Sequence, residues 1–230
     1  KMGFRDMILF QLNLIKKSLQ IELDSFFELV HGGEKRITKQ AYSEARRKIS
    51  PTAFIELDNA TLDWFYGDGD FDTFLGYRLL AMDVTVVELP DTKRLRDAFG
   101  YASGAPGVQL ARAKAAGLYD VRNDLVVASI IGKYTTGERD LAKNLIARLK
   151  RTDVQPEPVR DLILFDRGYG SALFYWYLEN SGVKYLIRVK TGAQGDKQFR
   201  AAQKPDQVID YRVSDGKVIK MRVVRFPLES

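Results

Sequence analysis

The order of the predicted strands and helices is the feature that most constrains the fold of this chain. Three apolar, β-branched segments come first and predict strands over 77–89, 113–121 and 125–134. The turn between the last two is short enough for an antiparallel hairpin. Four further elements come after them: a helix over 135–151, a strand over 162–165, a helix over 171–180 and a strand over 185–189.

The sequence therefore predicts the order β-β-β-α-β-α-β. Right-handed crossovers would place the two late strands parallel to the first strand, in one mixed sheet. This order is that of an α/β, ribonuclease H-like fold. A plain doubly wound fold would instead have a helix directly after its first strand.

Segments of different pattern flank this predicted sheet. Residues 1–75 are helical in pattern: one apolar periodicity covers 4–30, a second helix is expected over 38–49, and Ser50-Pro51 opens a third. Beyond residue 190, Asp215-Gly216 separates two alternating segments and predicts a hairpin. We expect three parts: a helical N-terminal region (1–75), a ribonuclease H-like domain (76–190) and the start of a β-rich insertion (191–230).

The cysteine and histidine content limits the kinds of site that this chain can build. It has no cysteine and one histidine, His31, which excludes disulfides, thiolate metal sites and sites made of several imidazoles. A metal would need oxygen ligands, which favours Mg²⁺ or Mn²⁺ over Zn²⁺. No run of eighteen apolar residues and no signal-peptide pattern occurs, so we expect a cytoplasmic protein without a membrane partner.

Two aspartates lie on predicted neighbouring strands. Asp83 interrupts the first strand and Asp166 ends the strand over 162–165. Two carboxylates in one place repel each other unless a cation joins them, and metal ions held about 4 Å apart between carboxylates can catalyse phosphoryl transfer. The alternative for Asp166 is a turn or a helix cap. A purely structural role is less expected for Asp83, because an acid buried inside an apolar strand is costly without a partner.

Several ordered motifs resemble one known family. The segments "GYRLLAMDVTVVELPDT" and "FGYASG" resemble the first acidic motif of insertion-sequence-4 type transposases in the DDE superfamily. The stretch "LYDVRNDLVVASIIGKYTTGERDLAKNLI" resembles the family's next segment, and "LILFDRGYGSALFYWYLENSGVKYLIRVK" resembles the second acidic motif. The segment "ITKQAYSEARRKIS" resembles the region ahead of the catalytic domain. The resemblance covers most of residues 35–190.

This resemblance implies metal-dependent DNA transposition by a ribonuclease H-like catalytic domain with Mg²⁺ or Mn²⁺. The partners it implies are insertion-sequence ends and target DNA, held by a homodimer or a higher multimer at the nucleoid. The first two catalytic acids, which are also metal ligands, carry over to Asp83 and Asp166. The family's third acid, a glutamate in a Tyr-Arg-Glu-Lys signature, has no match before Ser230. We therefore expect a C-terminally truncated chain with impaired strand transfer.

Two residues are candidate accessory groups near these acids. Glu138 opens the helix after the third predicted strand, as an accessory acid does in ribonuclease H itself. The alternative is a capping-box glutamate, since Thr135 stands three residues earlier. Arg167 could pair with Asp166 or with a scissile phosphate.

Basic residues in two places are candidates for DNA contact, in a chain whose formal net charge is +6. Phosphate contacts would position DNA more than read its sequence, and the alternative is an ordinary solvated surface. The candidates in the N-terminal region and at the end of the last strand of the sheet are Lys35, Arg36, Lys39, Arg46, Arg47, Lys48, Arg188 and Lys190.

Two other functions stay open at this point. A general ribonuclease H-like nuclease would need a further acid within the chain, such as Asp120 or Glu138. A non-catalytic remnant of a transposase would keep the basic residues and bind DNA without cutting it.

Overall fold

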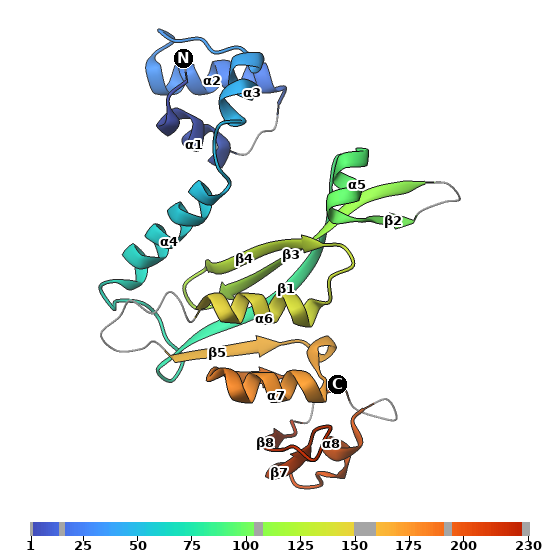
Figure 1. The fold of residues 1–230 in the computed structure, drawn as a ribbon. Helices are drawn as coiled ribbons and strands as arrows, with labels where there is room; N and C mark the ends of the chain where they lie inside the picture. Colours follow the sequence, from blue (N-terminus) through green and yellow to red (C-terminus); the bar gives the residue numbers. More distant parts are fainter. Residues whose placement is uncertain (1, 14–16, 104–107, 150–159, 191–194, 227–230) are drawn as a thin grey trace. The chain divides into compact units, whose positions relative to one another are not determined.

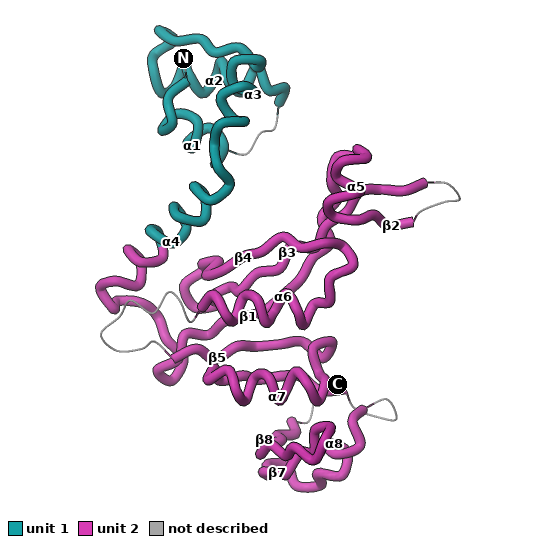
Figure 2. The backbone as a smooth tube through the Cα atoms, in the orientation of Figure 1, with its two compact units in different colours: residues 1–61 teal, residues 62–230 magenta. Residues whose placement is uncertain are grey.

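The computed structural model describes residues 2–13, 17–103, 108–149, 160–190 and 195–226. The chain divides into two compact units, Lys1–Thr61 and Leu62–Ser230 (Figure 2). Each unit is described by itself. The boundaries expected at residues 75 and 190 stay predictions.

The first unit is a small helical bundle. It contains α1 (Phe4–Leu12), α2 (Leu19–His31), α3 (Lys39–Arg46) and the beginning of α4 (Thr52–Tyr66). Phe10, fully buried, lies edge-on to Phe26 and to Tyr42, with ring centroids 5.4 and 5.0 Å apart. These aromatic contacts join three helices into one core.

The helix boundaries coincide with capping side chains. The Thr38 hydroxyl accepts a hydrogen bond from Ala41 N at the start of α3, and the Ser50 hydroxyl accepts one from Thr52 N at the start of α4. The apolar periodicity over 4–30 gives two helices rather than one, because the backbone is extended at Asn13 and at Ser18.

The second unit is built on a mixed sheet. Its strands are β1 (Tyr77–Glu88), β2 (Tyr101–Ser103), β3 (Gln109–Asp120), β4 (Leu125–Lys133), β5 (Arg160–Phe165) and β6 (Lys184–Ile187). β3 pairs antiparallel with β1, β2 and β4, whereas β5 pairs parallel with β1 and with β6. The predicted ribonuclease H-like order is confirmed, with β2 as an addition.

Two helices cover one face of this sheet (Figure 1). The side chains of α6 (Glu138–Leu149) and α7 (Ala172–Ser181) share one buried cluster with Leu80 and Met82 of β1 and with Ile163 of β5. Because side chains alternate along a strand, residues 81 and 83 lie on the other face. Exposed Ile131 and Leu186 are on that second face, which is therefore the more open one among the described residues.

The segment between β1 and β3 was not anticipated. It holds α5 (Lys93–Phe99) and β2, and β2 adds a strand to the five that are predicted for the sheet. The Thr92 hydroxyl accepts a hydrogen bond from Leu95 N and begins α5. The predicted end of the helix over 135–151, at residues 150 and 151, lies outside the described residues.

The predicted hairpin is present as β7 (Asp206–Arg212) and β8 (Val218–Val224), preceded by α8 (Lys197–Ala201). Asp215 and Gly216 have φ values of 61° and 73°, the positive values that a type I′ turn requires at both central positions. The hairpin packs against α7 through Tyr175, whose ring lies edge-on to Tyr211.

Asp120 has a structural role at the end of β3. Its carboxylate is fully buried and accepts hydrogen bonds from the Tyr66 hydroxyl at 2.7 Å and from Asn123 Nδ2 at 2.8 Å. It pairs with Leu80, three residues before Asp83. Asp120 is therefore committed to closing the β3–β4 turn, and a nuclease could not use it as a further acid.

A buried carboxylate also organises the first unit. Asp6 lies 2.8 Å from Lys35 Nζ and 3.2 Å from His31 Nε2, where the histidine makes a close approach without hydrogen-bond geometry. The hydrogen bond from Lys35 lowers the pKa of Asp6, against the opposing effect of burial. The stability that this carboxylate contributes is thus complete above its ordinary pKa of 3.8 and disappears as the pH falls through the lowered value.

We predict that Asp6→Asn destabilises the first unit by about 1–2 kcal/mol at pH 7 through loss of the charged hydrogen bond. The same substitution should reduce the sensitivity of α1 and α2 to acid. Hydrogen exchange of peptides from residues 1–61, measured in the whole chain between pH 3 and pH 7, tests this. Exposed Asp24→Asn is the control, and equal acid sensitivity in Asp6→Asn and the unchanged chain would contradict the prediction.

Candidate active site

The parallel register of β1 and β5 brings the two predicted acids to the same level of the sheet. Ala81 pairs with Leu164. Continued two residues beyond this last pair, the same register would set Asp83 level with Asp166, which directly follows β5. Asp83 lies on the more open face, and the alternation along β5 predicts the same face for Asp166.

Residues of β3, β4 and the segment after β6 lie at the same level of the sheet. On one side Asp83 pairs with Gly117 of β3, which pairs with Ser129 of β4. On the other side Arg188 N donates to Phe165 O at 3.1 Å, which sets Arg188 beside Asp166. Gly117 has no side chain, so the space next to the Asp83 carboxylate is open on the β3 side.

Asp83 is exposed, and its Oδ1 accepts a hydrogen bond from Val84 N at 2.8 Å. Asp83 therefore avoids the cost that burial without a partner would have imposed on an acid in this strand. Its place is explained by the open face, where an ionised carboxylate keeps its contact with water.

Asp166 is exposed as well, and it caps the short 3₁₀ helix η1 (Arg167–Tyr169) by accepting a hydrogen bond from Gly168 N. The capping alternative is thus present, and a cap leaves carboxylate lone pairs available. Arg167 is exposed, and the ion pairs among the described residues include none between Arg167 and Asp166. Lys190 is exposed two residues beyond Arg188.

Tyr169 is a buried tyrosine whose phenol is influenced by the charges of three acids. Its ring is buried in the sheet core, and its hydroxyl makes no hydrogen bond to a described residue. Burial raises the pKa of this phenol well above its ordinary value, and the charges of Glu138, Asp83 and Asp166 raise it further. Each of these carboxylates is therefore close enough to act on the same hydroxyl through space.

Glu138 is the first residue of α6, and this position contradicts the capping-box interpretation. In a capping box the glutamate is the third helical residue and the threonine is the N-cap. Here the backbone hydrogen bonds of Asp140 and Leu141 go to Gly137 O, so the helix begins after Gly137 and Thr135 lies outside it. Glu138 is exposed at the helix N-terminus, the end that favours a negative charge.

Arg139 was missed by the sequence analysis. Its Nε donates to Tyr169 O at 3.0 Å, and its Nη2 donates to Gly168 O at 2.9 Å and to Gly170 O at 3.2 Å. The turn after Asp166 is thereby tied to the first turn of α6. A single arginine next to Glu138 forms no periodic pattern or motif, so nothing in the sequence predicts this contact.

The donor set fits a hard cation only in part. Asp83 and Asp166 supply exposed carboxylate oxygens, which Mg²⁺ and Mn²⁺ prefer. Among the described residues, however, no group of three or more histidines, aspartates or glutamates is close enough to hold a metal ion. His31 belongs to the first unit, where it lies against Asp6. Asp83 and Asp166 are therefore two possible ligands, and the described residues include no group of three that could complete a site.

The predicted DNA-contacting residues of the first unit differ in their surroundings. Lys35 is engaged by Asp6 and by the ring of Phe27, 5.2 Å away. The others, in and around α3, are exposed: Arg36, Lys39, Arg46, Arg47 and Lys48. The Arg46 guanidinium lies 6.0 Å from the centre of the Tyr42 ring.

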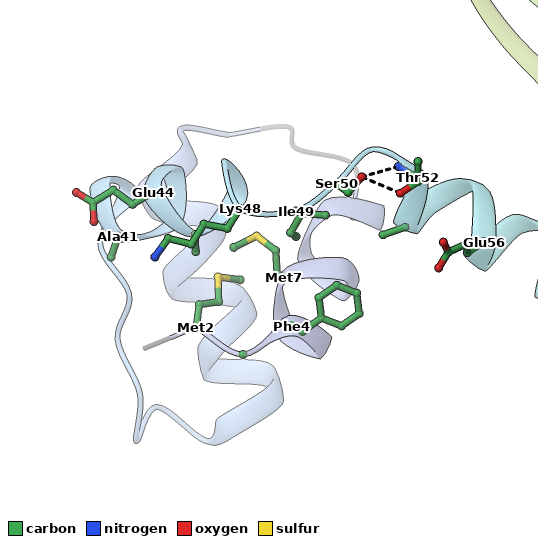
Figure 3. Close-up of a pocket in the computed structure, with 13 residues that line it drawn as sticks. Met2, Phe4, Met7, Ala41, Glu44, Lys48, Ile49, Ser50, Thr52 and Glu56 are labelled. Carbon is green, nitrogen blue, oxygen red and sulfur yellow. Dashed lines mark hydrogen bonds between the residues drawn. The ribbon is translucent and has the colours of Figure 1, made fainter.

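A cavity of about 630 Å³ lies beside α3 in the same unit (Figure 3). Met7 and Ile49 contribute apolar walls, and Lys48 and Glu44 contribute charged ones. The cavity contains none of the predicted catalytic residues.

Gly170 is tightly enclosed, and its substitution tests how rigid the turn after Asp166 is. A Cβ at Gly170 would lie 2.7 Å from the buried Tyr175 hydroxyl, whereas one at Gly168 would meet nothing closer than Asp166 Oδ1 at 3.4 Å. We predict that Gly170→Ala lowers the unfolding free energy by about 1–3 kcal/mol and that Gly168→Ala costs less. Urea unfolding compares the two, and equal losses would show that crowding by Tyr175 is not the cause.

The sequence also matches a known protein family. Residues 75–224 match the family described as Transposase DDE domain, a span that covers more than half of the chain. A search of curated proteins finds no match.

Three solved structures are similar at low identity. The Mos1 mariner paired end complex with Mn is 14% identical with a TM-score of 0.34, over 77% of this chain and 61% of that one. The piggyBac transposase synaptic complex with hairpin DNA is 12% identical with a TM-score of 0.44, over 96% and 52%. The Drosophila P element transposase strand transfer complex is 14% identical with a TM-score of 0.30, over 81% and 48%.

These TM-scores are too low to support an argument about mechanism, and the chain spans less than two thirds of each of those proteins. The family match rests on different grounds, because it covers β1 through β8 and includes both candidate acids. The chain therefore belongs to the transposase DDE domain family.

Proposed function

We propose that this chain is the catalytic part of a DNA transposase of the insertion-sequence-4 type, which cleaves DNA strands and transfers an insertion sequence with the help of a divalent metal. The observation that supports the proposal is that Ala81 pairs with Leu164 between β1 and β5, each two residues before one of the acids, within the residues that match the transposase DDE domain. In the proposed reaction, water hydrolyses a phosphodiester bond, and the freed 3′-hydroxyl attacks the target DNA.

In this proposal Asp83 and Asp166 hold Mg²⁺ or Mn²⁺, which would neutralise charge on the phosphate during transfer. Glu138 is the proposed accessory acid, supported by its place at the start of α6 and by its action on Tyr169. Arg167, exposed next to Asp166 in the chain, would contact the scissile phosphate.

DNA is the proposed partner. Exposed basic residues around α3, together with Arg188 and Lys190, would contact phosphates and position the duplex. Lys35 is the weakest of the candidates because it is engaged by Asp6. A homodimer or higher multimer acting on paired DNA ends, at the nucleoid, completes the proposal. No described helix is long and apolar enough to cross a membrane.

A non-catalytic, DNA-binding remnant is the second candidate, favoured because the described residues contain no group of three or more aspartates, glutamates or histidines that could hold a metal ion. Reading the coding sequence downstream of Ser230 separates the two candidates. A helix with Tyr, Arg, Glu and Lys at the family's spacing would favour the transposase, and a stop codon would favour the remnant.

We predict that the chain binds Mn²⁺ and that Asp83→Ala or Asp166→Ala abolishes this binding, because each substitution removes a proposed ligand. Isothermal titration with MnCl₂ measures the affinity. Asp97→Ala, which removes an exposed carboxylate from α5, is the matched control and should bind as the unchanged chain does. Unchanged affinity in both Asp83→Ala and Asp166→Ala would refute the proposed metal site.

We also predict that DNA binding falls steeply with salt and that Arg46→Gln, Arg47→Gln and Lys48→Gln together reduce the slope of log K against log salt by about 2–3. Fluorescence anisotropy with a labelled duplex measures this. The control replaces as many charges in the C-terminal segment, at Lys197, Lys204 and Lys220. A slope reduced equally by both sets would show that the contacts around α3 are not specific.

A further inference from the structure

The Arg139 side chain makes the densest set of polar contacts near the candidate acids. Its guanidinium donates to the carbonyl oxygens of three consecutive residues, Gly168, Tyr169 and Gly170, at 2.9 to 3.2 Å. These residues form the turn that comes directly after Asp166. One side chain of α6 therefore binds the backbone carbonyl groups of all three residues in that turn.

The same turn holds the Asp166 carboxylate. Gly168 N donates to Asp166 Oδ1, and Gly168 O accepts from Arg139 Nη2. Gly168 is thus bonded to Asp166 through its amide and to Arg139 through its carbonyl. A shift of the turn would move the amide that orients the carboxylate.

We propose that Arg139 is a positioning residue that fixes the direction of the Asp166 carboxylate towards the metal, an inference that rests on the function proposed above. Arg139 does not touch the carboxylate. It acts through the backbone of the turn. Glu138, the residue before it, lies in the same first turn of α6.

The chemistry of arginine suits this task. The planar guanidinium presents its N–H groups in a rigid fork, so that three carbonyls are held in a fixed relation to one another. A lysine in this position would supply the same charge on a flexible stem and could not reproduce the fork. The carbonyls of the turn accept the hydrogen bonds of Arg139, and its charge also acts on the buried Tyr175 hydroxyl.

Arg148 offers a matched control on the same helix. Its Nη1 donates to a single backbone carbonyl, Ser129 O, at 2.8 Å. Arg148→Ala therefore removes an arginine of α6 and a bond to the main chain, but it leaves the turn after Asp166 untouched. A purely structural role of Arg139 would give the two alanine variants the same effects.

The experiment compares the whole chain with its Arg139→Ala, Arg139→Lys and Arg148→Ala variants in two measurements. The first is the ¹H–¹⁵N signal and the exchange rate of the Gly168 amide in metal-free protein. The second is the affinity for Mn²⁺, from the electron paramagnetic resonance of MnCl₂. We expect both Arg139 variants to shift the Gly168 signal, to speed its exchange and to bind Mn²⁺ about tenfold more weakly, and Arg148→Ala to change neither.

A Gly168 amide that is unchanged in both Arg139 variants would overturn the inference. It would also fail if the amide moved but the Mn²⁺ affinity stayed the same, or if Arg139→Lys behaved as the unchanged chain. Should Arg139→Ala not fold, the lysine variant decides. If the unchanged chain does not bind Mn²⁺, the proposed function fails, and the amide comparison alone then judges whether Arg139 orients Asp166.

Discussion

The parallel pairing of β1 with β5 is the contact on which the second unit depends. It joins the antiparallel part of the sheet, β1 to β4, to the two later strands, and it crosses a long stretch of sequence to do so. The buried Arg78–Asp161 pair stands at its beginning, with Nε 2.8 Å from Oδ1. Asp83 and Asp166 each lie two residues beyond the last pair, Ala81 with Leu164. One strand register thus aligns both the core cluster under α6 and α7 and the candidate site on the opposite face.

Much of this fold could be predicted from the sequence because its signals are local. The β-branched segment at 77–89 gave β1, the short turn after Asp120 gave the β3–β4 hairpin, and Asp215-Gly216 gave the β7–β8 turn. Chain order and the handedness of crossovers were then enough to predict that β1 and β5 are neighbours. The elements α5 and β2 escaped prediction because both are very short.

The site could be predicted less fully than the fold, and the reason is physical. Asp83 and Asp166 could be named because one interrupts an apolar strand and the other ends one. Glu138 was weighed as a capping-box residue since spacing alone does not fix where a helix begins. Arg139 escaped altogether, because its partners are backbone carbonyls, which every residue has. Contacts between a side chain and a distant main chain leave no pattern in a sequence.

The alternation of Met82 and Asp83 along β1 has a consequence for how such a chain can evolve. Met82 is buried under the helices, and Asp83 is exposed on the opposite face. A one-residue insertion or deletion earlier in β1 would exchange the two, placing a charge in the core and a thioether in the water. Selection against unfolding would remove such a chain before its activity mattered. The requirement to pack the core therefore also keeps the carboxylate in its position. Insertions and deletions should be confined to the loops and to the segment between β1 and β3.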